Sequence, residues 1–282
     1  MWLFALPAVL INVVIVLIPG LLTFAAAFVI WDGSGIPVWA GLANFRTMFD
    51  DPVFWSALVN NVIWTAIFLS VPMILAVVMA SALLVAPRGR LVVQCIIFLP
   101  RILAVAVTGR IFQGMIFSPA TGVVAWLNAH GFSIADPLAD PDRSLYAVAS
   151  VDIWHWWGFL AIVFLAAMRQ ISVDQIEAAR LDGAGFFSLM RYVLLPGIRP
   201  TLALMMILTV IWSFQVFEFI YIITRGGPAY GSEVLATFAY RHAFFEGDVG
   251  QAAAAACVMS LFGLCATAVY LWLQITDDAQ ST

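Results

Sequence analysis

Six long apolar stretches constrain the fold of this chain more than any other feature of its sequence. They lie near residues 2–30, 54–86, 91–117, 145–169, 200–224 and 250–275, and each reaches the roughly 20 residues that a helix needs to cross a bilayer. The chain is 64% hydrophobic and only 10% charged, far from the composition of soluble domains. Because backbone polar groups inside lipid must be paired internally, these stretches favour helices. We predict an all-α, polytopic membrane protein whose residues 1–282 form a single domain with six transmembrane helices.

The polar segment 172–200 separates the fourth and fifth stretches and has a helical pattern of its own. Residues 174–185 predict a short amphipathic helix, which Ser172 caps with Gln175 at capping-box spacing. Gly183 is expected to end it, because glycine readily adopts the left-handed conformation that terminates helices.

A second short helix is expected at 186–194, ending before Pro196, and Pro200 then lies in the first turn of the fifth transmembrane helix. Small residues in the first short helix would let another surface approach its backbone, and charged residues flank them. Two interpretations fit this pattern: a docking surface for a cytoplasmic partner, or an ordinary loop lying on the membrane.

The distribution of arginines indicates the orientation, since basic residues gather in cytoplasmic loops. One set of loops carries six of them, and the alternate set carries four: Arg88, Arg90, Arg169, Arg180, Arg191 and Arg199 against Arg46, Arg143, Arg225 and Arg241. We expect the segment 172–200 and both termini to be cytoplasmic in a multi-pass protein of the bacterial cell membrane.

The spacing Glu-Ala-Ala-x3-Gly-x9-Val-x-Leu-Pro, from Glu177 to Pro196, matches the EAA loop of permeases of bacterial ATP-binding-cassette (ABC) importers. Three further segments resemble the carbohydrate branch of that family, in particular the larger permease subunits of maltose- and glycerolphosphate-type importers: GLANFRTMFDDPVFWSALVNN, GRLVVQCIIFLP and TRGGPAYGSEVLATFAYRHAFFEGDVGQAAA. All twelve Lys or Arg positions are arginine, and in this the sequence resembles actinobacterial members of the family, including trehalose importers.

This resemblance implies a permease subunit that moves a carbohydrate, such as the disaccharide trehalose, into the cytoplasm and is not an enzyme by itself. The implied partners are a second, homologous permease in a heterodimer, two copies of an ATPase, an extracytoplasmic sugar-binding protein and membrane lipid. The residues implied to contact the ATPase are Glu177, Ala178, Ala179, Arg180, Asp182 and Gly183. ATP and magnesium would bind to the ATPase, because this chain has no lysine for a phosphate-binding loop.

Polar side chains inside a membrane are costly and are therefore candidates for function. On the fourth stretch Asp152, His155, Trp156 and Phe159 share one helical face, and these residues correspond to the span on which the maltose permease family places sugar contacts. Hydrogen-bonding groups beside aromatic rings suit a sugar. The alternative is that Asp152 lies at the outer interface and that His155 packs within the bundle.

The fifth stretch carries a second polar set, from which we expect a lining for the same pathway: Thr209, Trp212, Ser213, Gln215 and Glu218. On the third stretch Arg101 is expected to extend to the cytoplasmic face, and Arg110 to form a buried ion pair, for example with Glu218 or Asp152. Asn60 and Asn61 favour packing or hydrogen bonds between helices.

Other classes of protein fit the sequence less well. The net charge of −4 argues against nucleic-acid binding. An ion-coupled secondary transporter would need inverted repeats and matching broken helices, and it leaves the EAA segment unexplained. An intramembrane enzyme would need a nucleophile beside Asp152 and His155, and the sequence has no such motif. No residues are assigned to catalysis or to a metal.

Overall fold

The computed structural model describes residues 2–85 and 88–281 of the chain. Residues 1, 86 and 282, which the predicted domain and second stretch include, lie outside the described residues. The helices of the described chain are joined by turns and loops, and its regular structure is otherwise limited to one short ribbon, in which β1 (Val29–Ile30) pairs antiparallel with β2 (Val38–Trp39). This confirms the predicted all-α class.

Within the described residues, five helical segments are long and apolar enough to cross a membrane, and a bent pair of helices makes a sixth. The five segments, in chain order, are α1 (Trp2–Asn12) continuing through the π-helical turn η1 (Val13–Leu17) into α2 (Ile18–Ala26); α4 (Pro52–Val85); α8 (Pro141–Met168); α12 (Arg199–Phe214) with α13 (Glu218–Ile223); and α15 (Val249–Ser281). The polytopic fold is therefore confirmed.

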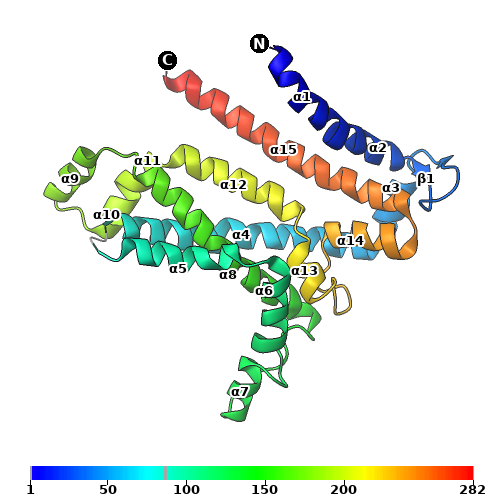
Figure 1. Ribbon diagram of the computed structural model, residues 1–282, viewed down its shortest axis with the longest axis horizontal. Helices are drawn as coiled ribbons and strands as arrows, with labels where there is room; N and C mark the ends of the chain where they lie inside the picture. The colour runs from blue at the N-terminus through cyan, green and yellow to red at the C-terminus, as the bar shows by residue number, and fades with distance from the viewer. Residues whose placement is uncertain (1, 86–87, 282) are drawn as a thin grey trace.

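The third stretch corrects the expectation of one continuous helix over 91–117. It consists of α5 (Arg90–Ile102) and α6 (Val105–Ile111), the latter continuing into η2 (Phe112–Ile116), and the two parts are bent by 93°. Leu103 and the residue after it have extended backbones, which interrupts the helical hydrogen-bond ladder. Beyond the bend, α6 packs against α13, and the chain continues to α7 (Val123–Ala129), which projects from the bundle (Figure 1).

The fifth stretch is also broken, between the end of α12 at Phe214 and the start of α13 at Glu218. The backbones of Gln215 and Phe217 leave the helical region there. Neither break was predicted from the sequence, so both correct the expectation of continuous transmembrane helices. Pro200 occupies the first turn of α12, as predicted.

The helix α4 lies at the centre of the bundle and packs against α8, α12 and α14 (Leu235–Arg241), while α15 packs against α2, α12, α14 and α3 (Ala43–Asp50) (Figure 1). Close approach of α5 to α8 depends on Gly158, where an added Cβ would lie 1.8 Å from the backbone oxygen of Ile97. Residues 252–255 of α15 are buried alanines, whose small side chains let neighbouring helices approach closely.

The segment 172–200 forms α9 (Val173–Leu181), followed by one helical run made of α10 (Phe186–Leu189), the π-helical turn η3 (Met190–Leu194) and α11 (Leu195–Gly197). Gly183, at a φ of +83°, ends α9 with the two hydrogen bonds of a Schellman motif, so α9 is shorter than predicted. The Ser172 side chain makes no capping bond, which corrects the expected capping box. The second helix passes through Pro196 rather than ending before it, because a wide π-helical turn precedes the proline.

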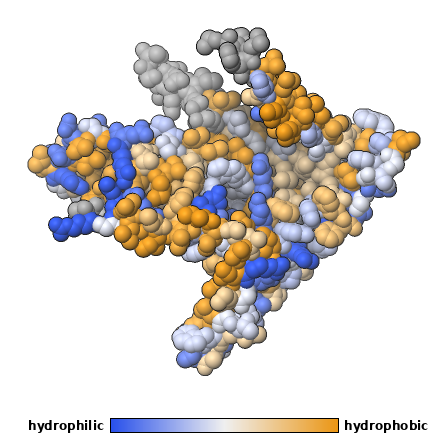
Figure 2. Space-filling view, viewed as in Figure 1, coloured by the Kyte–Doolittle hydropathy of each residue, from blue (hydrophilic) through white to orange (hydrophobic). Residues whose placement is uncertain are grey.

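Figure 2 shows hydrophilic residues gathered at the end of the molecule that carries α9, and hydrophobic residues over the helices between the two ends. This distribution suits a protein whose middle faces lipid and whose ends face water.

Candidate translocation cavity and coupling surface

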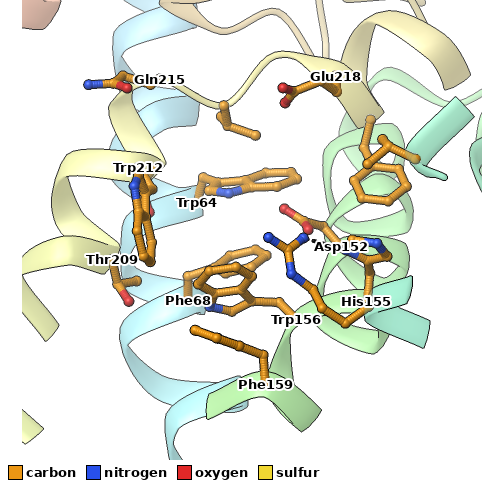
Figure 3. A pocket seen from close by; sticks show the side chains of 15 residues that line it. Trp64, Phe68, Asp152, His155, Trp156, Phe159, Thr209, Trp212, Gln215 and Glu218 are labelled. Carbon is orange, nitrogen blue, oxygen red and sulfur yellow. Dashed lines mark hydrogen bonds between the residues drawn. The ribbon is translucent and has the colours of Figure 1, made fainter. Parts of the chain in front are cut away.

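One cavity of about 530 Å³ lies between α4, α8 and the broken fifth segment. This volume falls within the ~300–1,000 Å³ typical of small-molecule sites. All nine residues predicted to line a substrate pathway border this single cavity: Asp152, His155, Trp156, Phe159, Thr209, Trp212, Ser213, Gln215 and Glu218 (Figure 3).

Aromatic rings form two walls of the cavity. On one, the Trp156 ring packs edge-on against Trp212 at 4.9 Å and lies 5.0 Å from Phe159. On the other, Trp64 and Phe68 of α4 stack with their ring centroids 5.0 Å apart. Such walls offer flat apolar faces to a ligand, and the polar groups between them can fix its orientation.

His155 is held at the bend of the third segment. It is 2% exposed, and its Nε2 lies 3.3 Å from the backbone oxygen of Leu103, where the helix α5 has just ended. Its Nδ1 lies 3.4 Å from Nη1 of Arg101. A neutral ring with the proton on Nε2 satisfies both contacts, because it donates to the carbonyl and accepts from the guanidinium. His155 therefore both borders the cavity and packs within the bundle.

Arg101 lines the cavity, which corrects the expectation that it extends to the cytoplasmic face. Its guanidinium lies 4.8 Å from the ring centroid of Trp156, within cation–π range. Arg101 lies in the last turn of α5, next to the bend, and its side chain there meets His155 of α8. Only one of its N–H groups has a hydrogen-bond partner among the described residues, which leaves donors for a ligand.

Two carboxylates border the same cavity, Asp152 from α8 and Glu218 from the start of α13. Figure 3 shows Glu218 above the ring of Trp64 and Asp152 below it in that view. Neither forms a salt bridge within 4.0 Å in the part of the chain that the structure describes. The cavity thus combines two acceptor groups and one arginine.

Arg110 does not form the predicted buried ion pair. It is exposed, and its Nη1 donates to Oε1 of Gln113, one turn further along, at 2.8 Å. Arg110 is not among the residues that line the cavity bordered by Asp152 and Glu218, although Val105 at the start of the same helix is.

Trp64 and Phe68 were not predicted to line the cavity, and Arg101 was predicted at the cytoplasmic face instead. Trp64 and Phe68 are four residues apart on one helical face, a spacing that could have indicated the wall. The position of Arg101 had no such signal, because it depends on the bend. Among the described residues there is no group of three or more His, Cys, Asp or Glu that could hold a metal ion.

The helix α9 presents an uncovered surface at one end of the bundle. Ile176 and Ala179 pack toward the core, while Glu177, Ala178, Arg180, Asp182 and Gly183 are exposed. The apolar Leu181 is 88% exposed. Phe187 and Tyr192, from the following helical run, are also exposed. Exposed aromatic and aliphatic side chains amid charges are typical of an interaction site.

Comparison with known proteins relates the chain to transport systems. It is 31% identical over 275 residues to the sulfoquinovosyl glycerol transport system permease protein SmoG of Agrobacterium fabrum, covering 96% of this chain and 88% of that protein. It is 27% identical over 278 residues to the trehalose/maltose transport system permease protein MalF of Thermococcus litoralis, covering 96% and 92%.

The fold is similar to that of a chain in the crystal structure of a bacterial ABC transporter involved in the import of the acidic polysaccharide alginate. The TM-score is 0.83 at 23% identity, covering 100% of this chain and 96% of that one. Residues 72–274 match the family described as binding-protein-dependent transport system inner membrane component. The chain is therefore a multi-pass membrane permease subunit, not an enzyme by itself, and belongs to the family of binding-protein-dependent transport system inner membrane components.

Proposed function

We propose that this permease subunit passes a neutral carbohydrate, a disaccharide such as trehalose, from an extracytoplasmic binding protein into the cytoplasm. The observation that carries this proposal is the cavity of about 530 Å³ in which ring faces alternate with hydrogen-bonding groups. Sugar hydroxyls need donors and acceptors, and the apolar faces of sugar rings stack on aromatic side chains. The named substrates of both permease relatives contain a sugar.

The charge of the cavity favours a neutral sugar over an acidic one. Asp152 and Glu218 face the cavity together with a single arginine, Arg101. Repulsion between a sugar acid and the two carboxylates would oppose its passage. Hydroxyl groups, in contrast, can donate to both carboxylates and accept from the guanidinium.

The energy would come from partner subunits. We infer that α9 is cytoplasmic, as are both termini, and that it docks in an ATPase through Glu177, Ala178 and Gly183, with Arg180 and Asp182 at the edge and the half-buried Ala179 behind this contact. Exposed ion pairs contribute only about 0–1 kcal/mol, so the fit of the helix would matter more than its charges. A second, similar permease would complete the pathway as a heterodimer in lipid, and two ATPase copies would bind ATP and magnesium, leaving this chain without a cofactor of its own.

Uptake of labelled trehalose by proteoliposomes tests the proposal. The vesicles hold this chain with its partner permease and ATPase, with ATP inside and binding protein outside. We expect uptake that neutral disaccharides compete with and sugar acids do not, and that Trp156→Ala reduces at least about tenfold, as loss of a stacked aromatic contact predicts. Uptake that prefers sugar acids would contradict the proposed preference for neutral sugars. If no carbohydrate is taken up, the proposed function is refuted.

A further inference from the structure

Two adjacent asparagines of α4 connect this helix to distant parts of the chain. Asn61 is 0% exposed. Its Nδ2 donates to the backbone oxygen of Ser213 at 2.7 Å, and its Oδ1 accepts from the backbone N–H of Leu235 at 2.8 Å. Asn60 donates to the backbone oxygens of Gly231 and Glu233 at 3.1 and 2.8 Å. Asn60 therefore holds the loop 224–234 itself, whereas Asn61 joins the helix that follows this loop to the fifth segment.

The two groups that Asn61 joins are helix ends. Ser213 lies in the last turn of α12, just before the break, where carbonyls have no helical partner, and Leu235 begins α14, where the N–H groups have none. Ser213 and its neighbour Trp212 also line the cavity. The buried side-chain amide of Asn61 therefore pairs with a carbonyl at the end of α12, which lines the cavity, and with an N–H group at the start of α14.

The loop 224–234 joins α13 to α14, and its internal contacts lead us to expect that it moves as one piece. Thr224 and Ser232 are joined through their hydroxyls at 2.7 Å, and the Ser232 hydroxyl also donates to the backbone oxygen of Gly227. Arg225, Ala229 and Tyr230 all have positive φ values, a strained conformation that persists only where the surroundings enforce it. A displacement of this loop therefore reaches Leu235, and through Asn61 the end of α12, without being absorbed by the loop itself.

We propose that Asn61 is a positioning residue that transmits movement of the loop 224–234 to the cavity wall at Ser213. This role rests on the proposed function: α9 precedes the fifth spanning segment and the loop follows it, so a cytoplasmic α9 places the loop on the opposite side, where the binding protein would dock. Docking there would shift α14, and the amide of Asn61 would shift the end of α12 with it. Asparagine suits the task because one short side chain supplies both a donor and an acceptor.

Asn60 provides a matched control, because it is adjacent, buried, chemically identical and bonded to the loop that precedes α14, while none of its side-chain hydrogen bonds among the described residues reaches the fifth segment. The variants are Asn61→Leu, which removes both groups at similar size, Asn61→Thr, whose single short hydroxyl cannot reach both partners, and Asn60→Leu. The readout is ATP hydrolysis by the reconstituted complex, with and without trehalose-loaded binding protein. Assembly and apparent melting temperature are measured for each variant.

We expect the Asn61 variants to assemble, keep their basal hydrolysis and lose about fivefold or more of the stimulation, the lower end of usual coupling factors, while Asn60→Leu keeps it. If the Asn61 variants and Asn60→Leu keep the same stimulation of ATP hydrolysis, or lose it to the same extent, the proposal is overturned. Failure of both Asn61 variants to assemble, with Asn60→Leu intact, would assign Asn61 to folding instead. A wild-type complex that binding protein and sugar never stimulate would refute the proposed function first, and the role of Asn61 with it.

Discussion

Nη1 of Arg101 lies 3.4 Å from Nδ1 of His155, at the point where the third segment of the bundle bends by 93°. The imidazole also contacts the backbone oxygen of Leu103, which the bend leaves without a helical partner. The bend, the arginine and the cavity are therefore connected through one side chain. A helix break in a membrane protein is tolerated where such partners satisfy the freed backbone groups and where it lines a cavity.

Replacing Arg101 with glutamine should weaken sugar transport without unfolding the protein. The variant loses the charged donors that face the cavity, and hydrogen bonds to charged groups contribute about 1.5–3 kcal/mol each, so we expect the KM for uptake to rise by about tenfold or more. Uptake kinetics in proteoliposomes measure this. Arg110→Gln is the control, since Arg110 does not line the cavity and contacts Gln113, and an equal effect of both variants would remove Arg101 from the substrate pathway.

Alanine at position 158 should separate α5 from α8. Its Cβ would lie 1.8 Å from the backbone oxygen of Ile97, and a backbone atom cannot move aside as a flexible side chain can. We expect a loss of about 1–3 kcal/mol in stability, as in other overpacked sites, seen as a lower apparent melting temperature in detergent. Gly114→Ala, where no atom lies within 4 Å of the added Cβ, should leave the melting temperature unchanged. Equal melting temperatures for both variants would show that the two helices do not approach as closely as described.

Glu233, in the loop before α14, should make stability depend on pH. It is 1% exposed, and burial raises the pKa of its carboxyl from 4.5 to about 7, even though Nε of Arg241 lies 3.5 Å away. The folded protein therefore holds a proton that the unfolded chain has released, so stability falls as pH rises from about 4.5 to about 7 and is level above that. The loss is at most about 3 kcal/mol, since a tenfold change in proton affinity corresponds to about 1.4 kcal/mol.

Glu233→Gln tests this dependence, because glutamine has the shape of the protonated acid and does not ionise. Apparent melting temperatures at about pH 5 and about pH 8 should differ less in the variant than in the wild type, with the variant more stable at the higher pH. A wild-type stability that rises between these pH values while that of the variant stays level would mean that Arg241 keeps the carboxylate ionised.

Much of the cavity could be predicted from sequence because it depends on helical spacing. Asp152, His155, Trp156 and Phe159 repeat with the period of a helix, and α8 is a single helix throughout. Polar side chains on one face of such a helix must turn from lipid toward the bundle. The same reasoning brought Trp212 and Ser213 to this cavity.

The two breaks could not be predicted in the same way. The bend at Leu103 is stabilised by His155, which is 52 residues away in the chain, and the break after Phe214 by Asn61, which is 152 residues from Ser213. Contacts between distant residues leave no local pattern. For this reason the predicted position of Arg101 was wrong. The ion-pair partners predicted for Arg110 were wrong as well, because Arg110 lies outside the cavity that they border.

The central claim is that ATP hydrolysis by a partner drives sugar through this permease by way of α9. The most direct measurement is sugar-stimulated ATP hydrolysis by the reconstituted complex for wild type, Glu177→Arg and the control Asp50→Arg, which makes the same charge reversal on the exposed Asp50 of α3. We predict that Glu177→Arg abolishes the stimulation or the binding of the ATPase, and that Asp50→Arg preserves both. Unchanged stimulation in Glu177→Arg, or sugar uptake with no ATPase present, would contradict the account.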